Sequence, residues 1–227
     1  MVSGSRGAAV TTPPPQLGRP VGANGSQTRR RILTAAMRCV AEVGYSKASI
    51  REIARSAEVS SAALYNYFPT KSDLLTAAVA EIEAVALPRL RAAGQRDGDT
   101  VDRLAAVLDE SDQLMREYPY LAAFERAIRA EAAAVVRPLR SSGAELEPLR
   151  DIIADIIDDA RAHGALPRGC DADGVTDAVY ALARGLTEQA ASLPAPAYRS
   201  ALQSAKQLIR GTLFVTPTPP RTPRRRR

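Results

Sequence analysis

Cysteine, histidine and tryptophan are nearly missing from this 227-residue chain, which has two cysteines, one histidine and no tryptophan. Cys39 and Cys170 are too isolated to form a disulfide framework or a zinc site, and no second histidine can join His163 as a metal ligand. We therefore expect no metal site and no cofactor. A chain with so little cysteine is typical of a reducing cytoplasm.

Long hydrophobic runs are missing too. No apolar stretch approaches the ~20 residues that a membrane span needs. Residues 1–26 lack the apolar core of a signal peptide. We expect a cytoplasmic protein that has no membrane partner.

Catalytic motifs are also absent. The sequence has no glycine loop that could cradle a phosphate, no nucleophile elbow and no metal-ligand pair, so an enzyme is not expected. Aromatic residues make up only 4% of the chain, and β-branched residues are sparse, whereas alanine is abundant. This balance favours helices over strands.

The positive charge is unevenly distributed. Residues 27–75 contain eight basic and four acidic residues, whereas 76–216 contain 16 basic and 21 acidic ones. Residues 1–26 carry two arginines and the last eleven residues carry five, which gives a total net charge of +6. A polyanion would be attracted to the two ends of the chain and repelled by its middle.

Hydrophobic periodicity predicts an all-α protein with a three-helix head and a larger helical bundle. Helices are expected near 28–43, from Ser49, from Ser60 and from Thr70 or Ser72, and Pro88 should kink or end the last of these. Further helices are expected near 100–117, after Pro119, and at 145–163, 172–192 and 196–214. The predicted domains are a disordered arm (1–26), a three-helix head (27–72), a larger helical domain (73–215) and a disordered basic tail (216–227).

The segment from Ala48 to Leu75 has the pattern of a helix-turn-helix. Ala54 is small where two helices must cross, and Val59 and Leu64 would fill the core of the head. Ser60 can cap a second helix whose N-terminus suits a phosphate.

This segment resembles the tetracycline-repressor (TetR) family over about residues 27–79. The matching residues are Ser49-Ile50-Arg51-Glu52-Ile53-Ala54, Val59-Ser60, Leu64-Tyr65-Asn66-Tyr67-Phe68-Pro69 and Lys71, after a first helix that ends in Gly44-Tyr45. One position departs from the family: Glu58 stands in the turn where glycine is usual, because the backbone there adopts positive φ. We expect a slightly different turn or a cost of ~1 kcal/mol.

The resemblance implies a role for each matching position. Ser49 and Lys71 would bind phosphates, and Tyr65 and Tyr67 would contact the sugar-phosphate backbone. The full set of implied DNA-binding residues is Ser49, Arg51, Ser60, Ser61, Ala62, Ala63, Tyr65, Asn66, Tyr67 and Lys71. Alternatively, Tyr65, Tyr67 and Phe68 only pack the head. Arg19, in the arm, could enter a minor groove or simply be disordered, and Arg224–Arg227 could attract DNA or act as a solubilising tail.

The resemblance also implies an effector pocket and a dimer interface in the larger domain. Apolar stripes with small residues near 178–186 and 202–213 could form a homodimer interface or pack within one subunit. A mainly aliphatic pocket would favour an apolar ligand of unknown identity. The candidate pocket residues are Leu114, Tyr118, Leu121, Phe124, Ile128, Ile153, Ile156, Ile157 and Tyr180.

Two polar features of the larger domain can be explained by structural roles alone. Asp151, Asp155, Asp158 and Asp159 could hold a divalent ion, but a solvated face opposite an isoleucine stripe explains them better. His163 is expected to cap a helix C-terminus.

The sequence thus predicts a homodimeric repressor that a small ligand releases from a near-palindromic double-stranded DNA operator. One alternative is a DNA-binding architectural or constitutive regulator that takes no ligand. Another is an enzyme with an added helix-turn-helix, which the missing motifs argue against.

Overall fold

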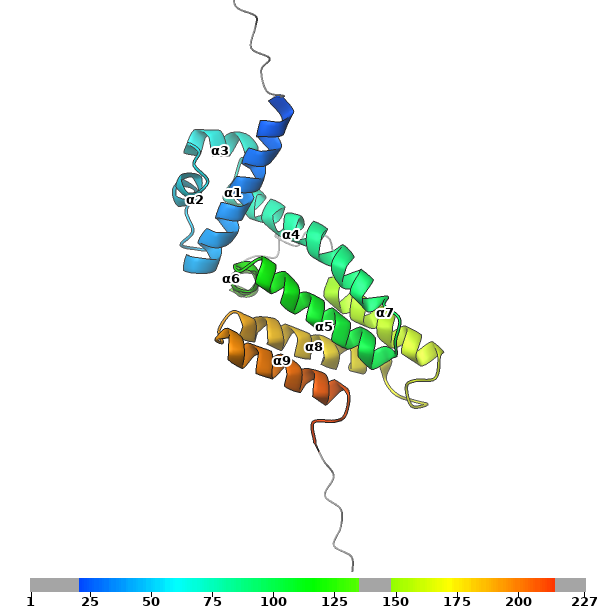
Figure 1. Cartoon of the computed structure of the whole chain (residues 1–227). Coiled ribbons are helices and arrows are strands. Elements are labelled where there is room, and N and C mark those ends of the chain that lie inside the picture. The colour runs from blue at the N-terminus through cyan, green and yellow to red at the C-terminus, as the bar shows by residue number, and fades with distance from the viewer. Residues whose placement is uncertain (1–20, 135–147, 215–227) are drawn as a thin grey trace, which may run out of the picture.

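The computed structural model describes residues 21–134 and 148–214, and within these ranges it contains nine helices and no strand (Figure 1). This confirms the predicted all-α fold, with a helix-turn-helix head and a larger helical domain. The helices are α1 (Val21–Val43), α2 (Ile50–Ser56), α3 (Ser61–Tyr67), α4 (Lys71–Gly94), α5 (Thr100–Glu117), α6 (Leu121–Ala134), α7 (Pro148–Ala162), α8 (Ala172–Ala190) and α9 (Ala195–Ile209).

Two hydrophobic cores organise the molecule. The head core is formed by α1, α2, α3 and the first turns of α4, and its centre includes Ile32, Ile53 and Leu64. The second core lies among the helices of the larger domain, with Ile153, Ile156 and Ile157 of α7 fully buried. Because α4 contributes Leu74 and Leu75 to the first core and Leu90 to the second, it ties the two halves together (Figure 1).

Side-chain caps set several helix starts. Ser49 and Thr70 each form a capping box with the acidic residue three positions later, and Asp99 accepts from the Asp102 amide at 2.8 Å. Such caps satisfy backbone amides that a helix leaves without intrahelical partners.

Several helix boundaries differ from the sequence prediction, and α9 ends at Ile209 rather than at 214. α1 begins at Val21, inside the segment predicted to be a disordered arm. No proline lies between residues 21 and 43, so a helix formed further along can extend backwards one hydrogen bond at a time, although Gly22 and Gly25 each cost about 1 kcal/mol relative to alanine. α7 begins at Pro148, and the predicted start at 145 lies outside the described residues, as do residues 1–20 and the tail at 216–227.

Pro88 does not end α4, which continues to Gly94. A proline inside a helix loses one backbone hydrogen bond and crowds the preceding turn. The turns that follow are held by burial, because Leu90 and Ala93 are both in the second core. At Gly94 the helices approach so closely that a Cβ would lie 3.2 Å from Cδ1 of Ile156 in α7.

α6 packs against both halves. Phe124 is 1% exposed and belongs to the head core, and Ala127 and Ile128 pack against the same core. A further link is the hydrogen bond that the Ser46 hydroxyl, in the turn after α1, donates to the Glu131 carboxylate of α6 at 3.1 Å. The head therefore packs against α6 and is also connected to the larger domain through α4.

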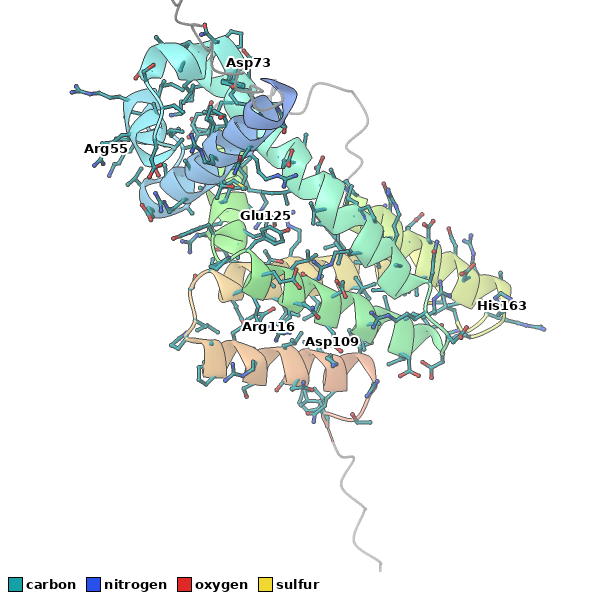
Figure 2. The ribbon with its side chains drawn as sticks, turned by 45° about the horizontal axis from the view of Figure 1, so that its top comes forward. Arg55, Asp73, Asp109, Arg116, Glu125 and His163 are labelled. Atoms are coloured by element: carbon teal, nitrogen blue, oxygen red, sulfur yellow. The ribbon has the colours of Figure 1, made fainter. Side chains whose placement is uncertain are left out.

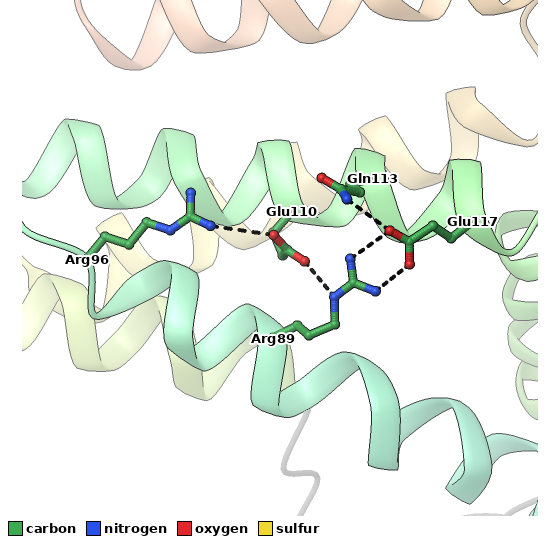
Figure 3. Close-up of polar contacts among 5 residues, drawn as sticks. All are labelled: Arg89, Arg96, Glu110, Gln113 and Glu117. Carbon is green, nitrogen blue, oxygen red and sulfur yellow. Dashed lines mark hydrogen bonds and ion pairs between the residues drawn. The ribbon is translucent and has the colours of Figure 1, made fainter.

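A network centred on Arg89 fixes α4 against α5 (Figure 3). Its guanidinium bonds Glu110 at 2.7 Å through Nε and Glu117 at 2.5 and 3.1 Å through both terminal nitrogens. Gln113 also donates to Glu117 at 2.9 Å. The hydrogen bonds from Arg89 and Gln113 lower the pKa of Glu117 to about 2.

We predict that Glu117 stabilises the fold in a pH-dependent way. Because its folded pKa is depressed, its contribution is fully present above the ordinary value of 4.5 and is lost as the pH falls from 4.5 towards 2. Glu117→Gln should therefore unfold at a lower temperature than the unmodified protein at pH 7. This difference should shrink when both are measured by circular dichroism near pH 3.

Glu42→Gln, at an exposed position on α1, is the matched control and should show no such trend. A melting-temperature difference for Glu117→Gln that stays constant from pH 7 to pH 3 would contradict the role of this ion pair.

Candidate DNA-binding face and effector cavity

The turn between α2 and α3 fixes the orientation of α3. Glu58 has φ +55° and is the one non-glycine residue with positive φ in the described ranges. The Val59 amide donates to the Ala54 carbonyl at 3.0 Å, and the Glu58 amide donates to the Arg55 carbonyl at 3.2 Å. This is a Schellman helix end, whose left-handed position normally holds glycine.

α3 presents a mixed small and aromatic face to solvent. Leu64 and Phe68 are buried in the head core, whereas Tyr65 and Tyr67 are 49% and 37% exposed. The predicted packing of Phe68 is confirmed, and the two tyrosines remain accessible. Ser61 and Ala63 are partly exposed, and Ala62 and Asn66 are exposed.

The N-termini of α2 and α3 are both capped by serines. The Ser60 hydroxyl accepts from the Ala63 amide at 3.0 Å. The Ser49 hydroxyl accepts from the Glu52 amide at 3.2 Å and donates to the Glu52 carboxylate at 2.8 Å. The Ser49 amide also donates to the Glu52 carboxylate at 3.3 Å, and the two hydrogen bonds that this carboxylate accepts from Ser49 lower the pKa of Glu52. Ser49 and Ser60 thus have structural roles whether or not DNA is bound.

Three basic side chains lie on α2 and at the start of α4. Arg51 is exposed on α2, as is Arg55, which lies on the outer surface of the head (Figure 2). Lys71 is partly buried: its ammonium lies 4.6 Å from the centre of the Tyr45 ring and donates to the Tyr45 carbonyl. Burial lowers the pKa of Lys71. Lys71 therefore holds the turn after α1 in place, a contact that the sequence did not indicate.

A cavity of about 380 Å³ lies in the larger domain. Its walls come from α4, α5, α6 and α8 and from the start of α7. Five of the nine candidate pocket residues line it: Leu114, Leu121, Phe124, Ile128 and Tyr180.

The other four candidates do not line this cavity. Ile153, Ile156 and Ile157 lie in the second core, because the apolar face of α7 packs against its neighbouring helices. Tyr118 is 42% exposed at the end of α5. Sequence reasoning also missed the α4 wall, including Val79, Ala86 and Leu87, and the charged residues Arg129 and Arg184.

The predicted acidic face of α7 makes surface ion pairs. Asp158 pairs with Arg161 at 2.8 Å, and Asp159 pairs with Arg103 at 3.0 Å. His163 lies at the far end of the larger domain (Figure 2), and its Nδ1 is 2.8 Å from the Asp159 carbonyl, as expected for a helix cap. No described helix is long and apolar enough to cross a membrane.

The apolar stripes of α8 and α9 are partly used within the subunit. Leu186, Leu202 and Ala205 are buried. Ala181 and Gly185 of α8 are exposed, as is Leu208 of α9 at 46%. The two helices lie side by side at one edge of the larger domain (Figure 1) and leave this small apolar surface uncovered.

We predict that Glu58→Gly stabilises the head. Glycine adopts the left-handed conformation without the crowding that a side chain suffers, so the free energy of unfolding should rise by about 1 kcal/mol. Urea denaturation measures this difference. Glu58→Ala is the control and should give no gain, because alanine has the same steric cost; equal stabilities of the glycine and alanine variants would contradict the strain.

Comparisons with known proteins agree with this architecture. Residues 32–78 match the family described as bacterial regulatory proteins, tetR family. The transcriptional repressor KstR of Rhodococcus jostii is 30% identical over 124 residues, which cover 53% of this chain and 57% of KstR. The nucleoid occlusion factor SlmA of Haemophilus influenzae is 29% identical over 96 residues, which cover 42% of this chain and 44% of SlmA. The chain thus spans about half the length of these curated relatives.

The solved structures extend the likeness to the larger domain. A protein from Rhodococcus sp. assigned to the TetR family of transcriptional regulators is 27% identical, with a TM-score of 0.65 over 81% of this chain and 98% of that one. Residues 32–78 thus match the head of the tetR family of bacterial regulatory proteins, and the arrangement of helices behind them is similar to that of a regulator assigned to that family.

Proposed function

We propose that this protein is a homodimeric transcriptional repressor that leaves its DNA operator when a small ligand fills the cavity of the larger domain. The observation that carries the proposal is Phe124, which lines the cavity and is also part of the head core. Its single ring contacts the two parts that a ligand-responsive repressor must couple. A repressor acts where its DNA is, so the proposal includes a cytoplasmic location.

In this proposal α3 enters the major groove. Its small residues Ser61, Ala62 and Ala63 allow close approach, and Asn66 faces the bases. Tyr65, Tyr67 and Lys71 contact the DNA backbone. Ser49 and Ser60 place the N-termini of α2 and α3 beside phosphates, and Arg51 reaches a base edge from α2. The basic head and acidic larger domain favour docking through this end.

The dimer is proposed to form across α8 and α9. The exposed surface around Ala181, Gly185 and Leu208 allows close approach of the same two helices from a second subunit. A two-fold axis there would place the two heads on one face of the DNA and match a near-palindromic operator.

The principal alternative is a DNA-binding protein whose larger domain only dimerises. One relative, SlmA, is named as a nucleoid occlusion factor, whereas KstR is named as a transcriptional repressor. The cavity favours the ligand-responsive proposal, because a domain that only dimerises has no need of a pocket lined by five helices.

The proposal predicts a specific footprint upstream of the protein's own gene. The protected region should contain two half-sites about 34 Å apart along the helix axis, one turn of DNA. DNase I footprinting on this fragment, with a scrambled fragment as control, gives the test. Protection of both fragments at equal protein concentration would contradict a sequence-specific operator.

Lys71→Ala separates a phosphate contact from the scaffolding role of Lys71. If Lys71 binds a phosphate in each subunit, the slope of log affinity against log salt should become shallower by about 0.9 for each phosphate that is no longer neutralised. Tyr45→Leu removes the ring under Lys71 but no charge, and it should leave the slope unchanged. An unchanged slope for Lys71→Ala would contradict the proposed contact between Lys71 and a DNA phosphate.

Filling the cavity by mutation should mimic a ligand. Ala86 lines the cavity from α4, and Ala86→Phe should lower operator affinity by roughly fivefold or more, the low end of typical allosteric coupling. Fluorescence anisotropy on labelled operator measures the change.

Ala84→Phe is the matched control, because Ala84 is exposed on the same helix. Equal operator affinities for the two variants, both folded by circular dichroism, would contradict coupling between the cavity and the head.

A further inference from the structure

α2 carries two arginines on its exposed face. Arg51 and Arg55 are four residues apart, so they lie on the same side of the helix, about 6 Å apart along its axis at ~1.5 Å per residue. Both are exposed, and Figure 2 shows Arg55 on the outer surface of the head. The other side of α2 buries Ile53 and Ala54 in the head core. The described part of the protein thus leaves both guanidinium groups open to solvent.

The two guanidinium groups make no ion pair and no hydrogen bond within the described residues. Glu52 lies between them in the sequence, and its carboxylate accepts hydrogen bonds from the Ser49 hydroxyl and amide at 2.8 and 3.3 Å. These hydrogen bonds lower the pKa of Glu52, and the charge of Arg55 adds a smaller effect. Because like charges four residues apart on a helix repel each other, an external anion near the two arginines would stabilise α2.

The charges around α2 do not balance. Arg38 of α1 bonds the Ser56 hydroxyl at the end of α2 and so adds its charge to this surface. Within residues 47–58, with Arg38 added, the cations are Arg38, Lys47, Arg51 and Arg55 and the anions are Glu52 and Glu58. The surplus of positive charge favours a negatively charged partner.

The helix dipole accounts for one of the two arginines. Arg55 is in the last turn of α2, where a positive charge interacts favourably with the dipole. Arg51 is in the first turn, where the same dipole disfavours a positive charge. The dipole therefore does not explain the pair.

Arg55 lies at the end of α2 that leads into α3. Only residues 57–60 separate the two helices, which pack against each other (Figure 1). In a helix-turn-helix the N-terminal residues of the second helix contact base edges, while the first helix crosses the DNA backbone. Ser49 and Arg51, at the start of α2, are already proposed to contact DNA. A contact at Arg55 would bring the other end of α2 onto the same backbone, beside the start of α3.

We propose that α2 lies along the DNA backbone and that Arg55 binds a phosphate beside the groove that α3 enters. A guanidinium suits a phosphate because its planar fork donates two parallel, charge-assisted hydrogen bonds. This inference rests on the DNA-binding function proposed above and adds one residue to the DNA interface.

Arg55→Gln tests the contact on the operator fragment found by footprinting. The slope of log affinity against log salt should become shallower by about 0.9 for each phosphate that is no longer neutralised. Fluorescence anisotropy with the full chain at several salt concentrations measures this slope. Phosphate ethylation interference gives a second readout, because ethylation of one phosphate in each half-site should no longer weaken binding by Arg55→Gln. Arg55→Lys keeps the charge and should keep the slope.

Arg91→Gln is the matched control, because Arg91 is exposed near the far end of α4 and its replacement changes the net charge equally. It should leave the slope and the interference pattern unchanged. Equal slopes for Arg55→Gln and Arg91→Gln would overturn the inference. A lower melting temperature of Arg55→Gln with an unchanged slope would overturn it too, since Arg55 would then serve the helix dipole alone.

These results also separate the two proposals. If the unmodified protein prefers its operator to a scrambled fragment and Arg55→Gln keeps the full slope, the contact is wrong and the DNA-binding function stands. If the unmodified protein shows no such preference, the proposed function and the inference are both overturned.

Discussion

The packing of Phe124 is the contact on which the relation between the two halves of the molecule depends. Its ring is buried in the head core and also forms part of the cavity wall. Close-packed protein interiors have no free volume into which such a side chain can move. Any occupant that displaces Phe124 must therefore shift α6 or the head, and α6 lies directly against α1.

Contacts elsewhere in the larger domain restrict which helices can move in response. Arg89 holds the middle of α4 against Glu110 and Glu117 of α5, and the contact at Gly94 holds its last turn against α7. The head-proximal turns of α4 carry Leu74 and Leu75 into the head core instead. Because the far end of α4 is fixed, a ligand that displaces the cavity wall would move the head. The proposed mechanism requires a movement of this kind.

The head could be predicted closely from the sequence, because its signals are local. Ser49, Ser60 and Thr70 each form the expected cap, and Glu58 adopts the positive φ that its place in the turn requires. Local rules were less decisive at Pro88, where they leave open either a kink or an end of the helix. Pro88 does not end α4, because the turns that follow it are buried in the second core.

The cavity was harder to predict, because wall and core residues share one hydrophobic pattern. Ile153 and Ile128 both lie on apolar helical faces, yet only Ile128 borders the cavity. The difference depends on which helices pack behind each face, and one sequence does not encode that in a local signal. Arg129 and Arg184 gave no sequence signal either, because each reads as an ordinary charge on an amphipathic helix.

The most direct measurement is the distance between the α3 helices of the two subunits in the proposed dimer. Spin labels at Asn66→Cys, in a protein with Cys39→Ala and Cys170→Ser, would report this distance by pulsed electron paramagnetic resonance. We predict one distance for the unmodified protein on the operator, close to a turn of DNA, and a different distance for Ala86→Phe, whose added ring fills part of the cavity. Identical distance distributions for the two proteins, both folded by circular dichroism, would contradict the proposed coupling between cavity and head.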